Sequence, residues 1–336
     1  MAQFTQSRHM STRSQPVGMR RRPFLALAAA SVAPPLFAQS NWPDKPLRVI
    51  VPFVPGGPPD VVARLIQPRL SELLGQPIVV DNRGGAGGNI GTQAVAKSAP
   101  DGNTILITSS AYVVNTHFAE SGYSAERDFM PVTIVASQPN VIVSHPSLQA
   151  KNMAEVIAMA KSTPMAFATP GSGTTPHLTA ENFFNIANKL NMTPIHYRGA
   201  GQAVGAVVGG EPKLGCMAMT APLQNIKGGK LRALAVSSAK RLAILPDVPT
   251  LSELGHPDML DYTWVGAFLP AGTPAAVQAK WYDALTKALS SADIKEKLQA
   301  MAFDPLLETP AKTAEYVRAE IARWGQVVKH IGFKPE

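Results

Sequence analysis

Short apolar runs alternate with longer amphipathic segments along most of the chain. The run at 47–53 is rich in β-branched residues, which is typical of a strand covered on both faces. A turn of prolines and glycines follows at 55–59. Asp60 is a good N-cap candidate, so we expect a helix to begin there, with Val61 and Val62 opening its apolar face. This stretch predicts a strand, a tight turn and a helix in direct succession.

The same alternation continues toward the C-terminus. Further strand-like runs lie at 78–81, 104–108, 132–135, 141–144, 166–168, 193–196, 231–237 and 263–269. Helices are expected near 92–99, 153–161, 176–186, 200–208, 274–289 and 312–328. Strands that alternate with helices are typical of α/β domains with largely parallel sheets. The pattern predicts two such modules, the first interrupted by the second and resumed near residue 262.

We therefore expect an α/β protein of two domains, each a central sheet flanked by helices, with a ligand cleft between them. The first domain is discontinuous and comprises 39–146 and 262–336, and the second comprises 147–261. The length of 336 residues allows each domain a core of its own. Ligands of open α/β sheets bind outside the carboxyl ends of the strands, so the turns at those ends are the candidate site.

Two of these turns are candidate anion sites. Where a glycine-rich turn leads into a helix, free amide groups and the helix dipole favour a negative group. The turn at 55–59 is the first, and 169–176 is the second, with Thr175 as the expected cap and Pro176 in the first helical position. A plain βα turn is the alternative interpretation of each.

Three polar residues outside these turns are further candidates. Ser109 and Ser110 follow the strand at 104–108, where ligands of such sheets bind, although an ordinary surface loop is the alternative. Arg198 follows the strand at 193–196, and its planar guanidinium matches a carboxylate. A surface arginine without a ligand is the competing interpretation.

The first 38 residues have the organisation of an export signal. Arg20, Arg21 and Arg22 form a basic region, an apolar stretch spans 24–37, and Ala38 is a small residue at which cleavage could occur. Arg21-Arg22 also resembles the twin-arginine export pattern, with the general secretory route as the alternative. Met19 is a more natural start than Met1. The apolar stretch is short for a membrane anchor.

The charge and the motifs exclude several kinds of chemistry. The formal charge of +8 falls to 26 − 23 = +3 without the five arginines that precede Gln39, too weak a balance to indicate nucleic acid. The glycine-rich run at 84–91 has neither dinucleotide nor phosphate-loop spacing, so backbone crowding explains it better. Pro170 breaks the spacing of a nucleophile elbow around Ser172, and His177 is expected to be a packed or capping residue. We expect no cofactor and no metal.

Many short motifs resemble one family, and they occur in its order. They include Trp42-Pro43-Asp44-Lys45-Pro46, Ile50-Val51-Pro52-Phe53, Leu74-Gly75-Gln76-Pro77, Asp81-Asn82-Arg83-Gly84-Gly85, Tyr197-Arg198-Gly199, Leu245-Pro246-Asp247-Val248-Pro249-Thr250 and Pro270-Ala271-Gly272-Thr273-Pro274. This set resembles the substrate-binding proteins of tripartite tricarboxylate transporters, the Bug family of periplasmic solute receptors. The resemblance covers essentially everything after the export signal.

The resemblance implies a two-domain periplasmic-binding-protein-like fold of type II and a receptor rather than an enzyme. It would close about a hinge on a small carboxylate and deliver it, as a periplasmic monomer, to the membrane permease subunits. The ligand-binding residues that we expect are Phe53, Gly56, Gly57, Pro58, Asp60, Ser109, Ser110, Gly173, Thr174, Thr175, His177, Tyr197, Arg198 and Gly199. A small hydrolase or transferase in the same cleft, or a sensing protein without a permease, is the alternative.

Overall fold

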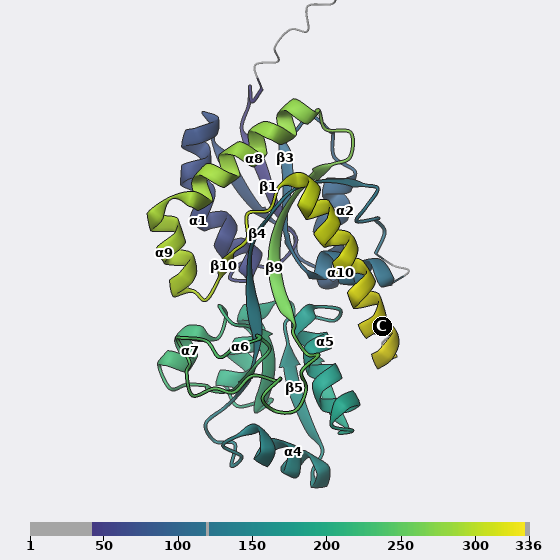
Figure 1. The fold of residues 1–336 in the computed structure, drawn as a ribbon, viewed down its shortest axis with the longest axis vertical. Coiled ribbons are helices and arrows are strands. Elements are labelled where there is room, and N and C mark those ends of the chain that lie inside the picture. The colour runs from purple at the N-terminus through teal and green to yellow at the C-terminus, as the bar shows by residue number, and fades with distance from the viewer. Residues whose placement is uncertain (1–41, 119–120, 333–336) are drawn as a thin grey trace, which may run out of the picture. The chain divides into compact units, whose positions relative to one another are not determined.

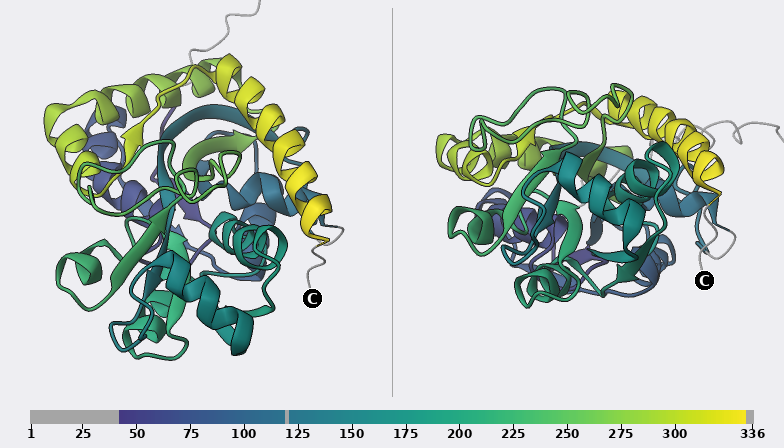
Figure 2. Two further views of the ribbon diagram at one scale, coloured as in Figure 1. Left: turned by 60° about the horizontal axis from the view of Figure 1, so that its bottom comes forward. Right: turned by 90° about the horizontal axis from the view of Figure 1, so that it is seen from below.

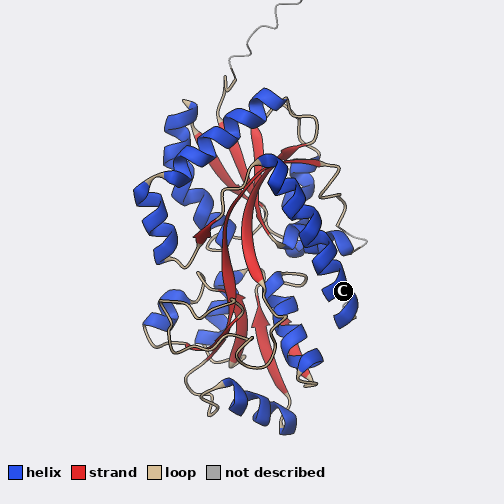
Figure 3. Ribbon diagram, viewed as in Figure 1, coloured by secondary structure: helices blue, strands red, loops and turns tan. Residues whose placement is uncertain are grey.

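The computed structural model describes residues 42–118 and 121–332. Figures 1 and 3 show that this part of the chain folds around a long curled β-sheet with helices packed against both faces. The expected export signal at 1–38 lies outside the described residues. Among the helices of the described part, none is long and apolar enough to cross a membrane.

The strands and helices follow the predicted alternation. The strands are β1 (Leu47–Val51), β2 (Ile78–Asn82), β3 (Thr104–Ser109), β4 (Phe129–Ser144), β5 (Met165–Thr169), β6 (Met192–His196), β7 (Leu214–Ala218), β8 (Arg232–Val236), β9 (Tyr262–Pro270) and β10 (Asp304–Pro305). The helices are α1 (Pro58–Leu74), α2 (Asn89–Ala96), α3 (Ala111–Val114), α4 (Met153–Ser162), α5 (Thr175–Glu181), α6 (Ala200–Val208), α7 (Leu223–Lys227), α8 (Ala275–Ser290), α9 (Ala292–Ala300) and α10 (Pro310–Ile331). Short 3₁₀ turns η1 (Ala86–Gly88) and η2 (Asn115–His117) and a π-helical stretch η3 (Asn182–Ala187) complete the set.

One long strand, β4, belongs to both halves of the sheet. Its first part, from Phe129 to Pro139, pairs with β9, and its last part, from Asn140 to Ser144, pairs with β7 and β8. The separate strands expected at 132–135 and 141–144 are therefore one strand, and that prediction was wrong. The polar residues between the two apolar runs, Gln138 and Asn140, are buried where the strand passes from one half to the other.

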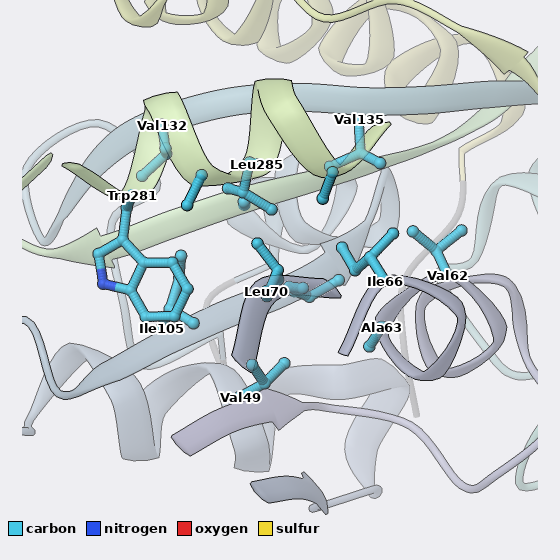
Figure 4. Packing of buried hydrophobic residues seen from close by; sticks show 14 of the residues in the cluster. Val49, Val62, Ala63, Ile66, Leu70, Ile105, Val132, Val135, Trp281 and Leu285 are labelled. Carbon is cyan, nitrogen blue, oxygen red and sulfur yellow. The ribbon is translucent and has the colours of Figure 1, made fainter. Parts of the chain in front are cut away.

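The first half of the sheet is β2-β1-β3-β9-β4. The pairs β1–β2 and β1–β3 are parallel, and β9 runs antiparallel to β3 and β4. The predicted return of the chain to the first sheet near residue 262 is therefore confirmed. On one face, Ile66 and Leu70 of α1 pack with Trp281 and Leu285 of α8 over the strand residue Ile105 (Figure 4). Residues of α2, α3 and α10 cover the opposite face.

The second half continues from β4 through β7, β5 and β6. The β5–β6 and β5–β7 pairs are parallel, whereas β4 is antiparallel to β7. A core containing Phe167, Phe183 and Phe184 also includes buried residues of α4 and α5. A second core around Met217 and Val207 packs α6 and α7 against the other face. The apolar pattern predicted neither β7 nor α7, whereas β5, β6, α4 and α6 agree with the prediction.

The C-terminal helix α10 is in contact with both halves. It packs against α3 and β4 and also reaches α5 and η3. Figure 2 shows this helix in yellow along one side of the described part of the chain. Trp324 of α10 is fully buried, and its Nε1 donates to Glu320 Oε2 over 3.2 Å.

Candidate ligand-binding site

Two adjoining hollows lie where the strands end. The smaller, which we call the small cavity, has a volume of about 40 Å³, and the other, the large hollow, has about 420 Å³. Phe53, Val54 and Pro170 line both of them, so the two hollows lie side by side. A cavity of about 40 Å³ has room for one small group, such as a carboxyl group or a hydroxyl group.

Three helices begin at the small cavity. Residues 57–59 of the α1 turn, 174–176 of the α5 turn and 199–200 of the α6 turn all line it. The α5 helix passes directly into η3, so its helical run is longer than one or two turns. Pro58, Pro59 and Pro176 have no amide hydrogen to donate, but each helix start still presents the positive end of its dipole, and the remaining amides can donate. The cavity therefore favours an anionic group.

The α1 turn differs from the prediction in where the helix begins. Gly57 is the N-cap residue, with φ −80° and ψ 167°, and Pro58 and Pro59 are the first two helical residues. Proline fits these positions because the first amides of a helix have no intrahelical partner. Asp60 is therefore the third residue of the helix and not its N-cap, so that prediction was wrong.

Asp60 instead holds the turn from inside the helix. Its carboxylate is 3% exposed and accepts hydrogen bonds from the Gly56 amide, Asn82 Nδ2 and Arg64 Nε, each over 2.9 Å. The Gly56 amide is thus not free for a ligand, contrary to expectation. In the described part of the chain, the Gly57 amide donates no hydrogen bond, and it lies at the small cavity.

The α5 turn also begins one residue earlier than expected. Thr174 is the N-cap, Thr175 opens the helix and Pro176 is its second residue. The predicted cap at Thr175 was therefore wrong. Behind the turn, the Gly173 amide donates to His177 Nδ1 over 3.3 Å. His177 is fully buried, and burial lowers its pKa to about 3, so the imidazole is neutral near pH 7.

The α6 turn carries the cation of the site. Arg198 lines the large hollow and is the one Lys or Arg among the residues that line either hollow. Tyr197 lies beside it in the same lining. Gly199 has φ +152°, and a Cβ there would collide with Val54 of the α1 turn. The glycine therefore lets the α6 turn approach the α1 turn closely.

Hydroxyl groups form one wall of the small cavity. Ser109, Thr175 and Thr263 line it, and all three residues are buried. Thr175 Oγ1 lies 2.7 Å from Thr263 Oγ1 and 3.1 Å from Ser110 Oγ, so the hydroxyls are linked to one another. The exposed-loop interpretation of Ser109 and Ser110 was wrong, because both are covered by the chain.

The predicted site residues divide into two groups. Nine of them line the hollows: Phe53, Gly57, Pro58, Ser109, Thr174, Thr175, Tyr197, Arg198 and Gly199. Five lie outside both linings: Gly56, Asp60, Ser110, Gly173 and His177. Asp60, Ser110 and His177 nevertheless contact the turns or the hydroxyl wall through the hydrogen bonds given above.

Several lining residues were not among the expected ligand-binding residues, although those at 59, 170–172 and 176 fall in the two candidate turns. They are Val54, Pro59, Pro170, Pro176, Ala200, Ala218 and Thr263 in the small cavity, and 84–88, 171–172 and His196 in the large hollow. Thr263 had a usable signal, since it is a hydroxyl residue at the start of the returning strand. Crowding accounts for the glycine run, as expected: a Cβ on Gly87 would lie 2.8 Å from the Ser172 carbonyl oxygen.

The lining of the hollows is poor in groups for acid–base chemistry. Neither lining contains an aspartate, a glutamate, a lysine or a cysteine. Within residues 42–118 and 121–332, no cluster of three or more His, Cys, Asp or Glu residues could hold a metal ion. Cys216, the one cysteine of the sequence, is buried, and burial raises the pKa of its thiol.

Known proteins are similar to this chain in both sequence and fold. The family model described as "Tripartite tricarboxylate transporter family receptor" matches residues 62–333. Protein BugT of Bordetella pertussis is 38% identical over 314 residues, which is 92% of this chain and 95% of that protein. A UPF0065 protein from the tcbD-tcbE intergenic region of Pseudomonas sp. strain P51 is 35% identical over 92% of this chain and 94% of its own length.

Solved structures of similar proteins agree with this fold. R. palustris Rpa4515 with adipate has a TM-score of 0.84 at 32% identity and matches 88% of this chain and all of its own. MatC (Rpa3494) from Rhodopseudomonas palustris with bound malate has a TM-score of 0.80 at 31% identity, over 85% of this chain and all of its own. The fold is thus a two-domain periplasmic-binding-protein-like α/β fold, and the matching family model describes a transporter receptor rather than an enzyme. The chain belongs to the Bug family of tripartite tricarboxylate transporter receptors.

Proposed function

We propose that this chain is an exported receptor that captures a small carboxylate in the small cavity and the large hollow and delivers it to a tripartite tricarboxylate-type permease. The convergence of the α1, α5 and α6 N-termini on one cavity carries the proposal, because such helix starts favour an anionic group. The similar proteins with bound adipate and malate support it, since both compounds are dicarboxylates.

In this proposal the two ends of the site have different roles. One carboxylate lies at the helix starts, near the Gly57 amide. Arg198 at the large hollow pairs with a second negative group or with the exposed end of the ligand. Asp60 and His177 do not contact the ligand and instead shape the turns that do.

The proposal includes closure of two domains about a hinge. The proposed domains are those expected from the sequence, 39–146 with 262–336 and 147–261, except that the pairing of β4 moves the first crossing point to about Asn140. The second crossing point lies at the start of β9. The turns of the two domains approach each other closely at Val54 and Gly199 and at Gly87 and Ser172. Contacts that exist only in the closed state stabilise it by the difference in their free energy between the two states.

A thermal-shift screen of the purified mature protein against mono-, di- and tricarboxylates tests the binding function. A ligand at about 100 times its Kd should stabilise the fold by about 2.7 kcal/mol. Gly57→Val is the matched control, because φ −80° suits any residue and the nearest atom to an added Cβ is the Val54 carbonyl oxygen at 4.0 Å. This variant should fold and bind nothing, because its side chain fills the small cavity. If no carboxylate stabilises the wild-type protein, the proposal is wrong.

Export and delivery need separate measurements. The mature protein should be found in the periplasm as a monomer, with its N-terminus within a few residues of Gln39 after removal of the signal peptide. N-terminal sequencing and light scattering measure these two properties. Uptake of the bound carboxylate by cells should require both this receptor and a permease of the tripartite type, which a deletion of either gene tests.

A further inference from the structure

A continuous chain of hydrogen bonds leads away from the hydroxyl wall of the small cavity. We call it the hydroxyl chain, and its members all belong to buried residues. In order they are Ser110, Thr175, Thr263, Asn140, Thr179 and Asp261, with successive distances of 3.1, 2.7, 2.8, 2.9 and 2.9 Å. It joins α3, α5, β9 and β4, and it ends beside α10.

Asp261, at the far end of the hydroxyl chain, determines which group donates and which accepts in each of its hydrogen bonds. Asp261 is 4% exposed, and its Oδ1 accepts a hydrogen bond from Arg323 Nη1 over 2.9 Å. Glu320 accepts from Nε of the same arginine over 2.8 Å, so the guanidinium is held between two carboxylates. A carboxylate paired in this way only accepts hydrogen bonds. The Thr179 hydroxyl must therefore donate its single proton to Asp261 Oδ2.

The donor or acceptor role of each remaining group in the hydroxyl chain follows from this step. Because Thr179 has used its proton, it accepts from Asn140, whose NH₂ group must face it. The oxygen of the same amide then faces Thr263, which donates to it. Thr263 in turn accepts from Thr175, and Thr175 accepts from Ser110. Every proton in the hydroxyl chain points away from the small cavity and toward Asp261.

The wall of the small cavity thus offers lone pairs rather than protons. Thr175 and Thr263 have no proton left for a ligand, although each oxygen retains one free lone pair. The third threonine of the lining, Thr174, donates its proton to the Gly171 carbonyl oxygen over 2.8 Å. In the described residues, Ser109 is the lining hydroxyl that donates to no protein group, and its oxygen lies 3.4 Å from the Ala111 amide.

We propose, on the basis of the proposed carboxylate-binding function, that the ligand presents a hydroxyl group to Thr175 and Thr263, so that the receptor is specific for hydroxycarboxylates. A carboxylate oxygen against these acceptors would leave buried lone pairs facing each other, which is unfavourable in a desolvated site. A ligand hydroxyl can donate to the wall and accept from Ser109. The carboxylates of the ligand then use the helix N-termini and Arg198.

The test compares acids that differ by one hydroxyl group. The purified mature protein is titrated in a calorimeter with three pairs of acids. The first pair is succinate and malate, with each enantiomer of malate measured separately. The second is glutarate and 2-hydroxyglutarate, and the third is adipate and 3-hydroxyadipate. In the pair of acids that binds most tightly, we expect the hydroxy acid to bind at least about tenfold more tightly than the parent acid, the one without the hydroxyl group. Tenfold is the effect of one hydrogen bond. Equal or tighter binding of the parent acid overturns this inference but leaves the proposed function intact. Binding of no acid overturns both.

Two threonine variants test whether the hydroxyl chain is responsible. Thr263→Val keeps the shape of the side chain but removes the oxygen from the wall, so the ratio of the two affinities should fall to about one. Thr313→Val is the matched control, because Thr313 is also fully buried but lies on α10 outside the hydroxyl chain. In Thr313→Val, the ratio of the affinities for the two acids should equal that of the wild type. A preserved ratio in Thr263→Val would overturn the assignment, and because the ratio is taken within one variant, a loss of stability cannot mimic it.

Discussion

Replacing Asp60 by alanine should destabilise the protein more than the loss of an ordinary helix cap. Three donors converge on this carboxylate: the Gly56 amide, Asn82 Nδ2 and Arg64 Nε. The Arg64 side chain is 49% exposed, so its ion pair contributes about 0–1 kcal/mol. The other two are hydrogen bonds to a charged acceptor, which contribute about 1.5–3 kcal/mol each. The free energy of unfolding should therefore fall by about 3–7 kcal/mol.

Urea unfolding followed by tryptophan fluorescence measures this change, with an unchanged m value as the sign that the folded state is the same. Asp293→Ala is a suitable control, because Asp293 also lies in the first turn of a helix but its side chain is 66% exposed. That variant should lose much less stability than Asp60→Ala, because solvent screens an exposed acid at a helix start. If Asp60→Ala loses no more than about 2 kcal/mol, the range for a simple cap, the carboxylate does not hold the turn as argued.

Three further predictions concern the site. Arg198→Ala should weaken carboxylate binding about tenfold or more, and added salt should weaken the wild type more than the variant in calorimetry. Gly199→Ala should weaken binding because its Cβ collides with Val54, and Val54→Ala in the same chain should recover part of the loss. Burial lowers the pKa of His177 from 6.5 to about 3, so unfolding takes up a proton below pH 6.5. The free energy of unfolding should fall by about 2 kcal/mol from pH 7.5 to 5, and His177→Gln, compared with the wild type by urea unfolding, should lack this component.

The fold was largely accessible from the sequence because local patterns determine it. Short β-branched runs, glycine turns and amphipathic helices gave most of the strands and helices, and the apolar run at 263–269 indicated the return to the first sheet. The start of α1 was misplaced because two prolines compete with Asp60 as a helix-start signal, and the prolines occupy the first turn. The junction in β4 was missed because Gln138 and Asn140 interrupt its apolar run. Tertiary hydrogen bonds satisfy both ends of the Asn140 amide and the oxygen of Gln138.

The site residues could be predicted from the sequence only where a single turn contains a recognisable local motif. Gly57, Thr174 and Gly199 were found because a glycine or a hydroxyl residue before a helix has a local meaning. Ala218 and Val54 carry no such signal, since an apolar residue in a lining looks like any other core residue.

The direction of the hydroxyl chain could not be found in any single stretch of sequence. It depends on Asp261 and Thr179, which are 82 residues apart, and on Arg323, which is 62 residues beyond Asp261. A threonine in the sequence is both a donor and an acceptor, and only its partners decide which role remains for a ligand. Counting hydroxyls in the lining therefore overstates the donors of this site. The buried carboxylate, which touches neither hollow, decides that the threonine wall accepts hydrogen bonds.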